Sequence, residues 1–412
     1  MWRKNKYLKR LFSKYYRNAK VHIPKSLPQR EFAFVYFGKE EYMHRHIAFS
    51  NEEELISHIR KNTPRHVFYS SAYYEYPAAS NMNEKEWLGA ELIFDIDVDH
   101  IDTPCKKLHD KWFCLNCGAS GWGVPPQTCY KCGSERIKRE TWICETCLSV
   151  AKDEALKLID FLIDDFGFSR RKLVITFSGH RGFHVHIDEE DILKLDQDSR
   201  REISDYIRGV GVDYRFFIPV RSSLYPVYTL DYGAPAWLGR IMRALYNLFS
   251  SNILEQELKK IGLSSRKIEK ILSIRDEVVR KLEAVPPELE YLGKVIDPDS
   301  WEKIFHFITE EEGVKIDERV TIDIKRLIRL PESIHGKTGM KVAILSYQDL
   351  EEFNIEKHAV IFPSEIVKIS FKNPPRKVLN IDLPTSGGLF EVPFYAFVYF
   401  LANGAEVERV KT

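Results

Sequence analysis

The sequence predicts a mixed α/β protein, because strand alternation and helical spacing both occur in one chain of 412 residues. ELIFDIDVDH, residues 91–100, alternates apolar and polar residues as a half-buried strand does. RKLVITFSGHRGFHVHID, residues 171–188, has two strand-like runs around a short turn and therefore predicts a β-hairpin. Apolar residues recur at helical spacing in residues 1–20, 153–168 and 236–312, and the length allows two or three domains.

The first twenty residues carry eight Lys or Arg. Apolar and aromatic side chains recur among them at Leu8, Leu11, Phe12, Tyr15 and Tyr16. This spacing predicts an amphipathic surface helix docked on the core, whose charged face is also open to a polyanion. The formal net charge of the chain is only +1, so nucleic-acid affinity must come from such local basic patches.

Acidic residues occupy every second position of the strand predicted at 91–100. One face carries Leu92, Phe94, Ile96 and Val98, and the other carries Asp95, Asp97 and Asp99. Carboxylates spaced in this way repel one another unless a cation lies between them. The stretch therefore fits either a solvated edge strand or a divalent-metal site of the magnesium or manganese type.

All seven cysteines lie in residues 105–147, and an odd number in an intracellular chain argues against disulfides. Two Cys-x-x-Cys-Gly knuckles predict a zinc site formed by Cys114, Cys117, Cys129 and Cys132. The remaining candidate ligands, Cys105, His109, Cys144 and Cys147, predict a second structural zinc that encloses the first. One zinc with spare thiols, or exchanged pairings, are alternatives. Basic residues around the cluster suit phosphate contacts or a solvated surface: Lys106, Lys107, Lys111, Arg136, Lys138 and Arg139.

The tip of the predicted hairpin carries Ser178, His180 and Arg181 beside two glycines, at positions 179 and 182. Backbone amides, a hydroxyl and a guanidinium can converge there on an anion such as a triphosphate, although an ordinary surface hairpin would have the same pattern.

Residues 314–339 add two carboxylates, Asp317 and Asp323, and then a dense set of anion-binding side chains, Lys325, Arg326, Arg329, His335 and Lys337. A charged strand followed by an amphipathic helix that ends at Pro331 is the alternative interpretation. Together with the earlier motifs, these residues supply acids for metal ions and bases for phosphates, as phosphoryl transfer requires.

The longest apolar run, PFYAFVYFLA at 393–402, is too short to span a bilayer. It predicts a buried strand or a partner contact leading into a turn at Asn403-Gly404. The N-terminus lacks the features of a signal peptide, so we expect an intracellular, cytoplasmic protein with no membrane partner.

The sequence resembles the small catalytic subunit of archaeal and eukaryotic DNA primases, in its archaeal form, within the archaeo-eukaryotic primase superfamily. The resemblance is carried, in family order, by residues 30–34, 68–71, 94–97, 178–184 and 316–339. The sequence departs from the family pattern in two ways. Position 180 is His, where the family often has Arg, and the chain has two candidate zinc sites, where family members usually have a single zinc motif.

The resemblance implies two Mg²⁺ or Mn²⁺ ions held by Asp95, Asp97 and a third acid, Asp317, with Asp323 as the fallback and no role assigned to Asp99. It also implies that the nucleoside triphosphate is held by Ser178, Arg181, His184, Arg329 and His335. The expected reaction is synthesis of short RNA, or also DNA, primers on single-stranded DNA during replication.

The resemblance further implies a mixed α/β catalytic core of residues 1–104, 148–235 and 313–412, with a zinc-binding module at 105–147 and a helical insertion at 236–312. The expected partners are a primase large subunit, single-stranded template and nucleoside triphosphates, in a nucleoid-associated location. Alternatives are a stand-alone primase-polymerase acting in repair, a non-catalytic zinc-dependent nucleic-acid-binding protein and a two-metal nuclease.

Overall fold

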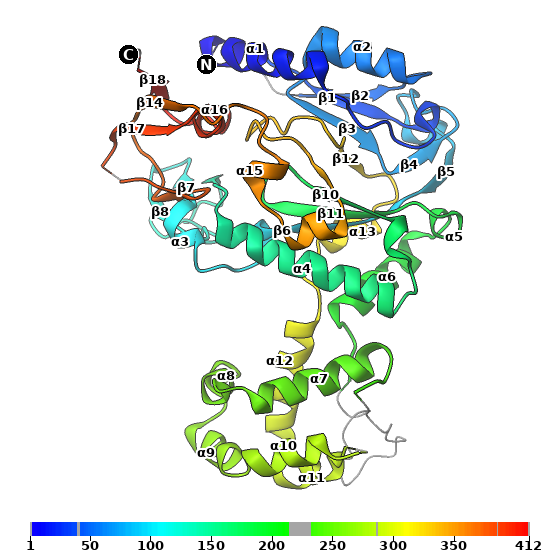
Figure 1. The fold of residues 1–412 in the computed structure, drawn as a ribbon, viewed down its shortest axis with the longest axis vertical. Coiled ribbons are helices and arrows are strands. Elements are labelled where there is room, and N and C mark those ends of the chain that lie inside the picture. Colours follow the sequence, from blue (N-terminus) through cyan, green and yellow to red (C-terminus); the bar gives the residue numbers. More distant parts are fainter. Residues whose placement is uncertain (1, 39–41, 214–231, 286, 385, 411–412) are drawn as a thin grey trace. The chain divides into compact units, whose positions relative to one another are not determined.

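A computed structural model of the chain describes residues 2–38, 42–213, 232–285, 287–384 and 386–410 (Figure 1). It confirms the mixed α/β fold, with several antiparallel sheets and many helices. The chain divides into two compact units. The first consists of Met1–Leu156, Arg170–Arg200 and Asp317–Thr412, and the second of Lys157–Ser169 and Arg201–Ile316.

The first unit contains a four-stranded antiparallel sheet in the order β12-β3-β1-β2. Its strands are β1 (Phe32–Val35), β2 (Met43–Ile47), β3 (His66–Ser70) and β12 (Leu327–Arg329). Helices α1 (Trp2–Asn18) and α2 (Glu52–Asn62) lie against this part of the unit (Figure 1). The predicted N-terminal helix is confirmed, because Leu8, Leu11, Phe12 and Tyr16 of α1 are buried.

A second four-stranded antiparallel sheet has the order β13-β10-β11-β6. Its strands are β6 (Leu92–Asp97), β10 (Leu173–Phe177), β11 (Gly182–Ile187) and β13 (Ile344–Leu345). The predicted hairpin is β10-β11, with Thr176 opposite His184. Strand β11 also pairs with β6, and this pairing places the acidic strand beside the hairpin.

A small cysteine-rich segment follows β6. It comprises α3 (Lys106–His109) and a three-stranded sheet in the order β8-β7-β9, formed by β7 (Lys111–Cys114), β8 (Ser120–Trp122) and β9 (Ile137–Glu140). The segment ends where α4 (Glu145–Asp164) begins.

The C-terminal part of the first unit corrects one prediction. Residues 393–402 were expected as a buried strand or a partner contact, but Phe394–Ala402 is a helix, α16, whose residues are all buried. It packs against a three-stranded sheet in the order β17-β14-β18, of β14 (Ile366–Phe371), β17 (Gly388–Pro393) and β18 (Val407–Arg409). A helix covered on all sides is apolar all round and therefore shows no helical period. The residues Asn403-Gly404 end this helix and do not form a hairpin turn.

Shorter elements complete the first unit and its boundary with the second. The helices are α5 (Glu190–Leu193), α6 (Gln197–Arg208), α13 (Glu318–Ile322), α14 (Tyr347–Glu351) and α15 (Ile355–His358). Two-stranded sheets pair β4 (Ala72–Tyr74) with β5 (Trp87–Ala90), and β15 (Lys377–Val378) with β16 (Ile381–Asp382). Single 3-10 turns occupy Leu27–Gln29, Met82–Glu84, Val98–His100 and Arg170–Lys172.

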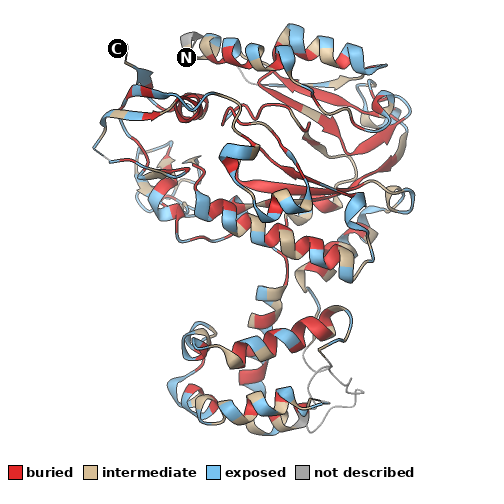
Figure 2. Cartoon of the chain, viewed as in Figure 1, coloured by how far each residue is buried: buried red, intermediate tan, exposed pale blue. Residues whose placement is uncertain are grey.

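The second unit is helical in its described part. Its helices include α7 (Ala236–Ser250), α8 (Leu254–Lys260), α9 (Ser265–Ser273), α10 (Arg275–Glu283), α11 (Leu289–Val295) and α12 (Pro298–Glu312). Buried and exposed residues alternate along these helices, as amphipathic helices require (Figure 2). Asp297 caps α12 by accepting the Ser300 N–H. Across the described residues, we find no helix with the length and apolar character needed to cross a membrane.

Candidate active site and metal centres

The acidic strand β6 lies directly beside β11 in the first unit. Asp95 stands opposite His184 in the antiparallel register, and Asp97 stands opposite Gly182. Because opposite residues share a face, the His184 Nε2 lies 3.5 Å from the Asp95 Oδ1. Burial, followed by the charges of His186 and nearby arginines, lowers the pKa of His184 well below 6.5. His184 is therefore a neutral imidazole next to a carboxylate.

The third predicted acid is held against β6 by the main chain. The Asp317 N–H donates a hydrogen bond of 2.8 Å to the Asp95 carbonyl oxygen. The Asp317 side chain accepts the Arg319 N–H at 3.0 Å, so it also caps α13. Asp323 instead accepts the Lys325 N–H. Of the two candidates, Asp317 is thus the acid that the structure brings to Asp95.

The three carboxylates are close enough for their charges to affect one another. Burial, followed by the charges of Asp97 and Asp317, raises the pKa of Asp95 to about 7, against the opposing effects of Arg326 and Arg329. Among the described residues, the only metal-ligating groups whose donor atoms all lie within 4.8 Å of one another are two cysteine groups. The carboxylates are therefore spaced more widely, as mutually repelling acids would be.

A basic cluster lies around Arg329, on β12. Its Nη1 is 2.7 Å from the His66 Nδ1, and its guanidinium lies over the Phe68 ring at 5.0 Å. His335 contacts His66 edge-on, with ring centroids 5.2 Å apart, and stacks on His180 at 5.3 Å. Burial lowers the pKa of Arg329 to about 10, while the charges of Asp95 and Asp97 oppose that shift. The basic cluster therefore faces the acidic strand.

The three histidines of this cluster are neutral. Burial lowers the pKa of His180 to about 4, and burial followed by the charge of Arg329 lowers the pKa values of His66 and His335 well below 6.5. Lys337, whose pKa is lowered by burial and then by Arg329, adds a second cation. The cluster thus combines two cations with imidazole groups that can each donate one hydrogen bond.

Glycines allow the hairpin turn to approach both neighbours. A Cβ on Gly179, at φ +79°, would lie 2.6 Å from the His335 Cβ, and one on Gly182 would lie 2.0 Å from the Ile96 carbonyl oxygen. The Thr338 Oγ1 donates to the Gly179 carbonyl at 2.6 Å and fixes the turn against the basic cluster. Ser178 lies at the same turn, where its Oγ accepts the His180 N–H at 3.3 Å.

The structure corrects the position of Asp99 and shows partners of Arg181 that the sequence did not indicate. Asp99 was expected on the acidic face of the strand, but β6 ends at Asp97 and Val98–His100 is a 3-10 turn. The reason is local, because the Asp97 carboxylate accepts the Asp99 N–H and so ends the extended backbone. Arg181, predicted to hold a triphosphate, is only 1% exposed and pairs with Asp99 and Asp110.

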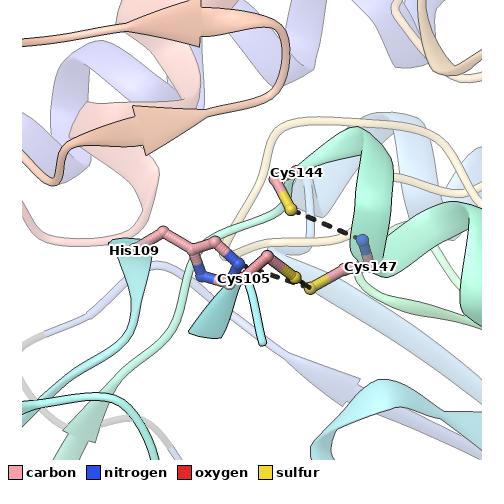
Figure 3. Close-up of side chains that lie close together, drawn as sticks. All are labelled: Cys105, His109, Cys144 and Cys147. Carbon is pink, nitrogen blue, oxygen red and sulfur yellow. Dashed lines mark hydrogen bonds between the residues drawn. The ribbon is translucent and has the colours of Figure 1, made fainter. Parts of the chain in front are cut away.

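Four buried side chains form the first cysteine group: Cys105, His109, Cys144 and Cys147 (Figure 3). The Cys147 Sγ lies 3.4 Å from the Cys105 Sγ and 3.4 Å from the His109 Nε2. Sulfurs bound to one tetrahedral zinc at 2.3 Å would be about 3.8 Å apart, so the spacing fits an ion with little adjustment. We call this group the outer site.

The second group is formed by Cys114, Cys117, Cys129 and Cys132, which we call the ribbon site. Sulfur pairs lie 3.6 Å apart across the two knuckles. Gly118 and Gly133 have φ of +72° and +68°, as the tight knuckle turns require. The structure thus brings together the same two groups of four that the spacing predicts.

The basic residues near these groups are not equivalent. Lys106 is buried and donates to the carbonyl oxygens of Val98 and Ile101, at 2.7 and 2.6 Å, so it is not available to phosphate. Lys107, Arg136, Lys138 and Arg139 are exposed.

Comparison with known proteins decides the family. A model of the DNA primase small subunit matches residues 134–345. The DNA primase small subunit PriS of Methanosarcina acetivorans is 32% identical over 98% of this chain and 96% of its own length. Those of Methanothrix thermoacetophila and Methanococcoides burtonii are each 34% identical over 97% of this chain, and over 98% and 97% of their own lengths.

The chain belongs to the DNA primase small subunit family. The family resemblance stated from the sequence motifs, and the function it names, are therefore confirmed at the level of the family. Sequence reasoning missed two residues that the structure adds to the candidate site, His66 and Asp110. Each had a local signal, because His66 lies two residues before the family motif at 68–71 and Asp110 directly follows the candidate ligand His109.

The raised pKa of Asp95 predicts how this primase subunit responds to pH in the absence of divalent cations. A carboxyl whose folded pKa exceeds its unfolded value stabilises the fold below the unfolded pKa, near 4, and that contribution is lost as pH rises to about 7. At pH 8, Asp95→Asn should therefore raise the thermal unfolding temperature of the metal-free protein. At pH 4 the gain should vanish.

The measurement is a melting curve with a chelator at each pH. The gain should also be absent when the wild type is saturated with Mn²⁺, since the cation then neutralises the carboxylates. An Asp95→Asn protein less stable than the wild type at pH 8 would contradict the charge repulsion.

Proposed function

We propose that this chain is the catalytic subunit of a DNA primase and makes short RNA, or also DNA, primers on single-stranded DNA by two-metal nucleotidyl transfer. Family membership supports the proposal. The single structural observation that carries the mechanism is the hydrogen bond from the Asp317 N–H to the Asp95 carbonyl. It sets a third carboxylate beside the Asp95 and Asp97 strand, opposite the Arg329 cluster.

In this proposal Asp95, Asp97 and Asp317 hold two Mg²⁺ or Mn²⁺ ions, for which carboxylate oxygens are suitable ligands. When bound, the ions stabilise the attacking 3′ oxygen and the pyrophosphate leaving group. His184 holds the orientation of Asp95 through its 3.5 Å contact. The raised pKa of Asp95 fits this role, because a cation removes the repulsion that raises it.

The triphosphate would bind at the basic cluster. Arg329 and Lys337 offset its negative charge, and His335 and His180 offer neutral N–H donors that cost little to bury. The hairpin turn supplies Ser178. These assignments, like the predicted role of His184 toward nucleotide, rest on two observations. His184 stands opposite Asp95 on the paired strands β11 and β6, and the charges of Asp95 and Asp97 act on Arg329.

The outer site and the ribbon site would each hold a structural zinc ion. All four ligand positions of each are filled by protein side chains, so neither has the open position that a catalytic zinc requires. We propose that residues 105–147 act as a zinc-binding module, that residues 1–104, 148–235 and 313–412 form the catalytic core and that residues 236–312 are an insertion. The proposed partners are a primase large subunit, single-stranded template and nucleoside triphosphates, in a nucleoid-associated location.

The test supplies a single-stranded template, Mn²⁺ or Mg²⁺ and labelled nucleotides without any primer. A primase subunit releases pyrophosphate and forms new dinucleotides and longer products. A non-catalytic zinc protein forms neither, and a two-metal nuclease shortens the template. A repair-type primase-polymerase would show full activity without any large subunit, so the assay is repeated with and without that partner.

A further inference from the structure

His109 turns its two ring nitrogens in different directions. The Nε2 faces the Cys147 Sγ at 3.4 Å, and the Nδ1 lies 2.7 Å from the Asp110 Oδ1. Metal-ligating histidines commonly donate their second N–H to a carboxylate, which fixes the tautomer and the ring orientation. Asp110 is thus placed to orient a ligand of the outer site.

Asp110 is also bound by Arg181. The Arg181 Nη1 lies 2.8 Å from each carboxylate oxygen of Asp110 and 3.3 Å from the Trp142 carbonyl. The Trp142 N–H donates to the same carboxylate at 3.2 Å. Both charged side chains are buried, at 1% and 9% exposure, so breaking the pair would leave an uncompensated charge in a poorly solvated place.

The other terminal nitrogen of Arg181 reaches the catalytic strand. Nη2 pairs with Asp99, whose N–H donates to the Asp97 Oδ1 at 2.9 Å. The Arg181 carbonyl also accepts the Val98 N–H at 3.2 Å. Arg181 therefore holds, by side chain and main chain, the turn that fixes the Asp97 carboxylate.

We propose that Arg181 is a positioning residue that couples the outer site to the catalytic carboxylate Asp97, and that it does not bind the nucleotide triphosphate. The proposal deepens the proposed function and rests on it for the role of Asp97. Arg181 and its partners Asp99 and Asp110 carry a net charge of −1, which would repel a triphosphate. The Nε N–H of Arg181 is buried and has no hydrogen-bond partner among the described residues.

The coupling has a measurable consequence in both directions. If Arg181 holds Asp97 in place for a divalent cation, weakening the path should weaken cation binding. Zinc in the outer site should strengthen cation binding, and a bound cation should strengthen zinc binding by the same factor. Loss of a partner that orients metal ligands costs about 10- to 100-fold in metal affinity or activity. Nucleotide affinity should not change, because no member of the path contacts the triphosphate.

The test compares Arg181→Lys and Asp110→Asn with the wild type in the full chain. Mn²⁺ affinity is measured by electron paramagnetic resonance titration, zinc content by a colorimetric assay, and kcat and KM for nucleotide by primer synthesis. We expect a Kd for Mn²⁺ raised about 10-fold or more, a comparable fall in kcat and a KM within twofold of wild type. Arg181→Lys keeps the charge but cannot bridge two carboxylates, so it serves if Asp110→Asn does not fold.

Asp102→Asn is the matched control, since Asp102 is an exposed carboxylate three residues beyond Asp99 and outside the path. It should leave all three readouts unchanged. A raised KM with unchanged Mn²⁺ affinity would make Arg181 a triphosphate ligand and overturn the proposal, as would variants that match the wild type. A wild type that bound no Mn²⁺ and made no primer would instead overturn the proposed function, and this inference with it.

Discussion

Asp95→Asn and Asp97→Asn should each lower primer synthesis by about 1,000-fold or more. We expect a loss of this size because a catalytic metal contributes several kcal/mol to transition-state stabilisation, and each 1.36 kcal/mol changes the rate about tenfold. Both side chains lie on the same face of β6. The apolar residues of this strand are buried, whereas the two acids are only partly buried. An amide keeps the shape of the carboxylate but loses the charge that binds the cations. The measurement is primer formation under saturating Mn²⁺.

Both variants should still fold and should keep the wild-type zinc content, because neither acid belongs to a cysteine group. The matched pair Asp317→Asn and Asp323→Asn then decides the third acid. Activity should be lost with the first and retained with the second, since only Asp317 is hydrogen-bonded to Asp95. Retained activity in Asp95→Asn and Asp97→Asn would refute the metal assignment.

Cys147→Ser should have the largest effect on stability. Apparent binding free energies of structural zinc reach about 10–16 kcal/mol, which is comparable with the whole stability of a domain. The outer site is also a junction, because the Ile143 N–H beside it donates to the Tyr399 hydroxyl of α16 at 2.9 Å, and the Leu379 N–H donates to the Ile143 carbonyl at 2.6 Å. Losing the ion should therefore loosen the packing of three segments that are distant in sequence: the outer site itself, α16 and the segment at Leu379. We expect the variant to lose cooperative unfolding.

Cys132→Ser is the comparison, because it removes a ligand of the same chemistry from the exposed end of the ribbon site. We expect it to lose one zinc per chain and to keep the main melting transition within a few degrees of wild type. Circular dichroism melting and zinc analysis measure both. Equal destabilisation by the two variants would show that the ribbon supports the fold as much as the outer site does.

Features with a strong local period were predictable from the sequence. The β10-β11 hairpin follows from period-two alternation around a glycine-rich turn, and pairing of Thr176 with His184 is its direct result. The two cysteine groups follow from knuckle spacing and from the number of leftover ligands. These signals are short in range, so no knowledge of tertiary packing was needed to find them.

Features set by tertiary contacts were not predictable. Helix α16 is apolar on every face, so neither period of two nor period of 3.6 was visible in 393–402. The ion pair of Arg181 could not be predicted, because its partner Asp110 is distant in sequence and comes close only in the folded protein. For the third acid, the resemblance favours Asp317 over Asp323, but the main-chain hydrogen bond that joins Asp317 to Asp95 cannot be read from the sequence.

Both four-stranded sheets of the first unit take a strand from beyond residue 316, β12 in one and β13 in the other. Asp317, the proposed third acid, lies on the same returning segment of the chain, more than 200 residues after Asp95. A growing polypeptide therefore cannot complete either sheet until the intervening helices have been made, and any fragment ending before residue 327 should be inert. Closing a longer loop adds only about 0.6 kcal/mol per doubling of its length. The helical second unit can therefore change in length during evolution at little cost in stability, provided that the segments before and after it still pair in the two sheets.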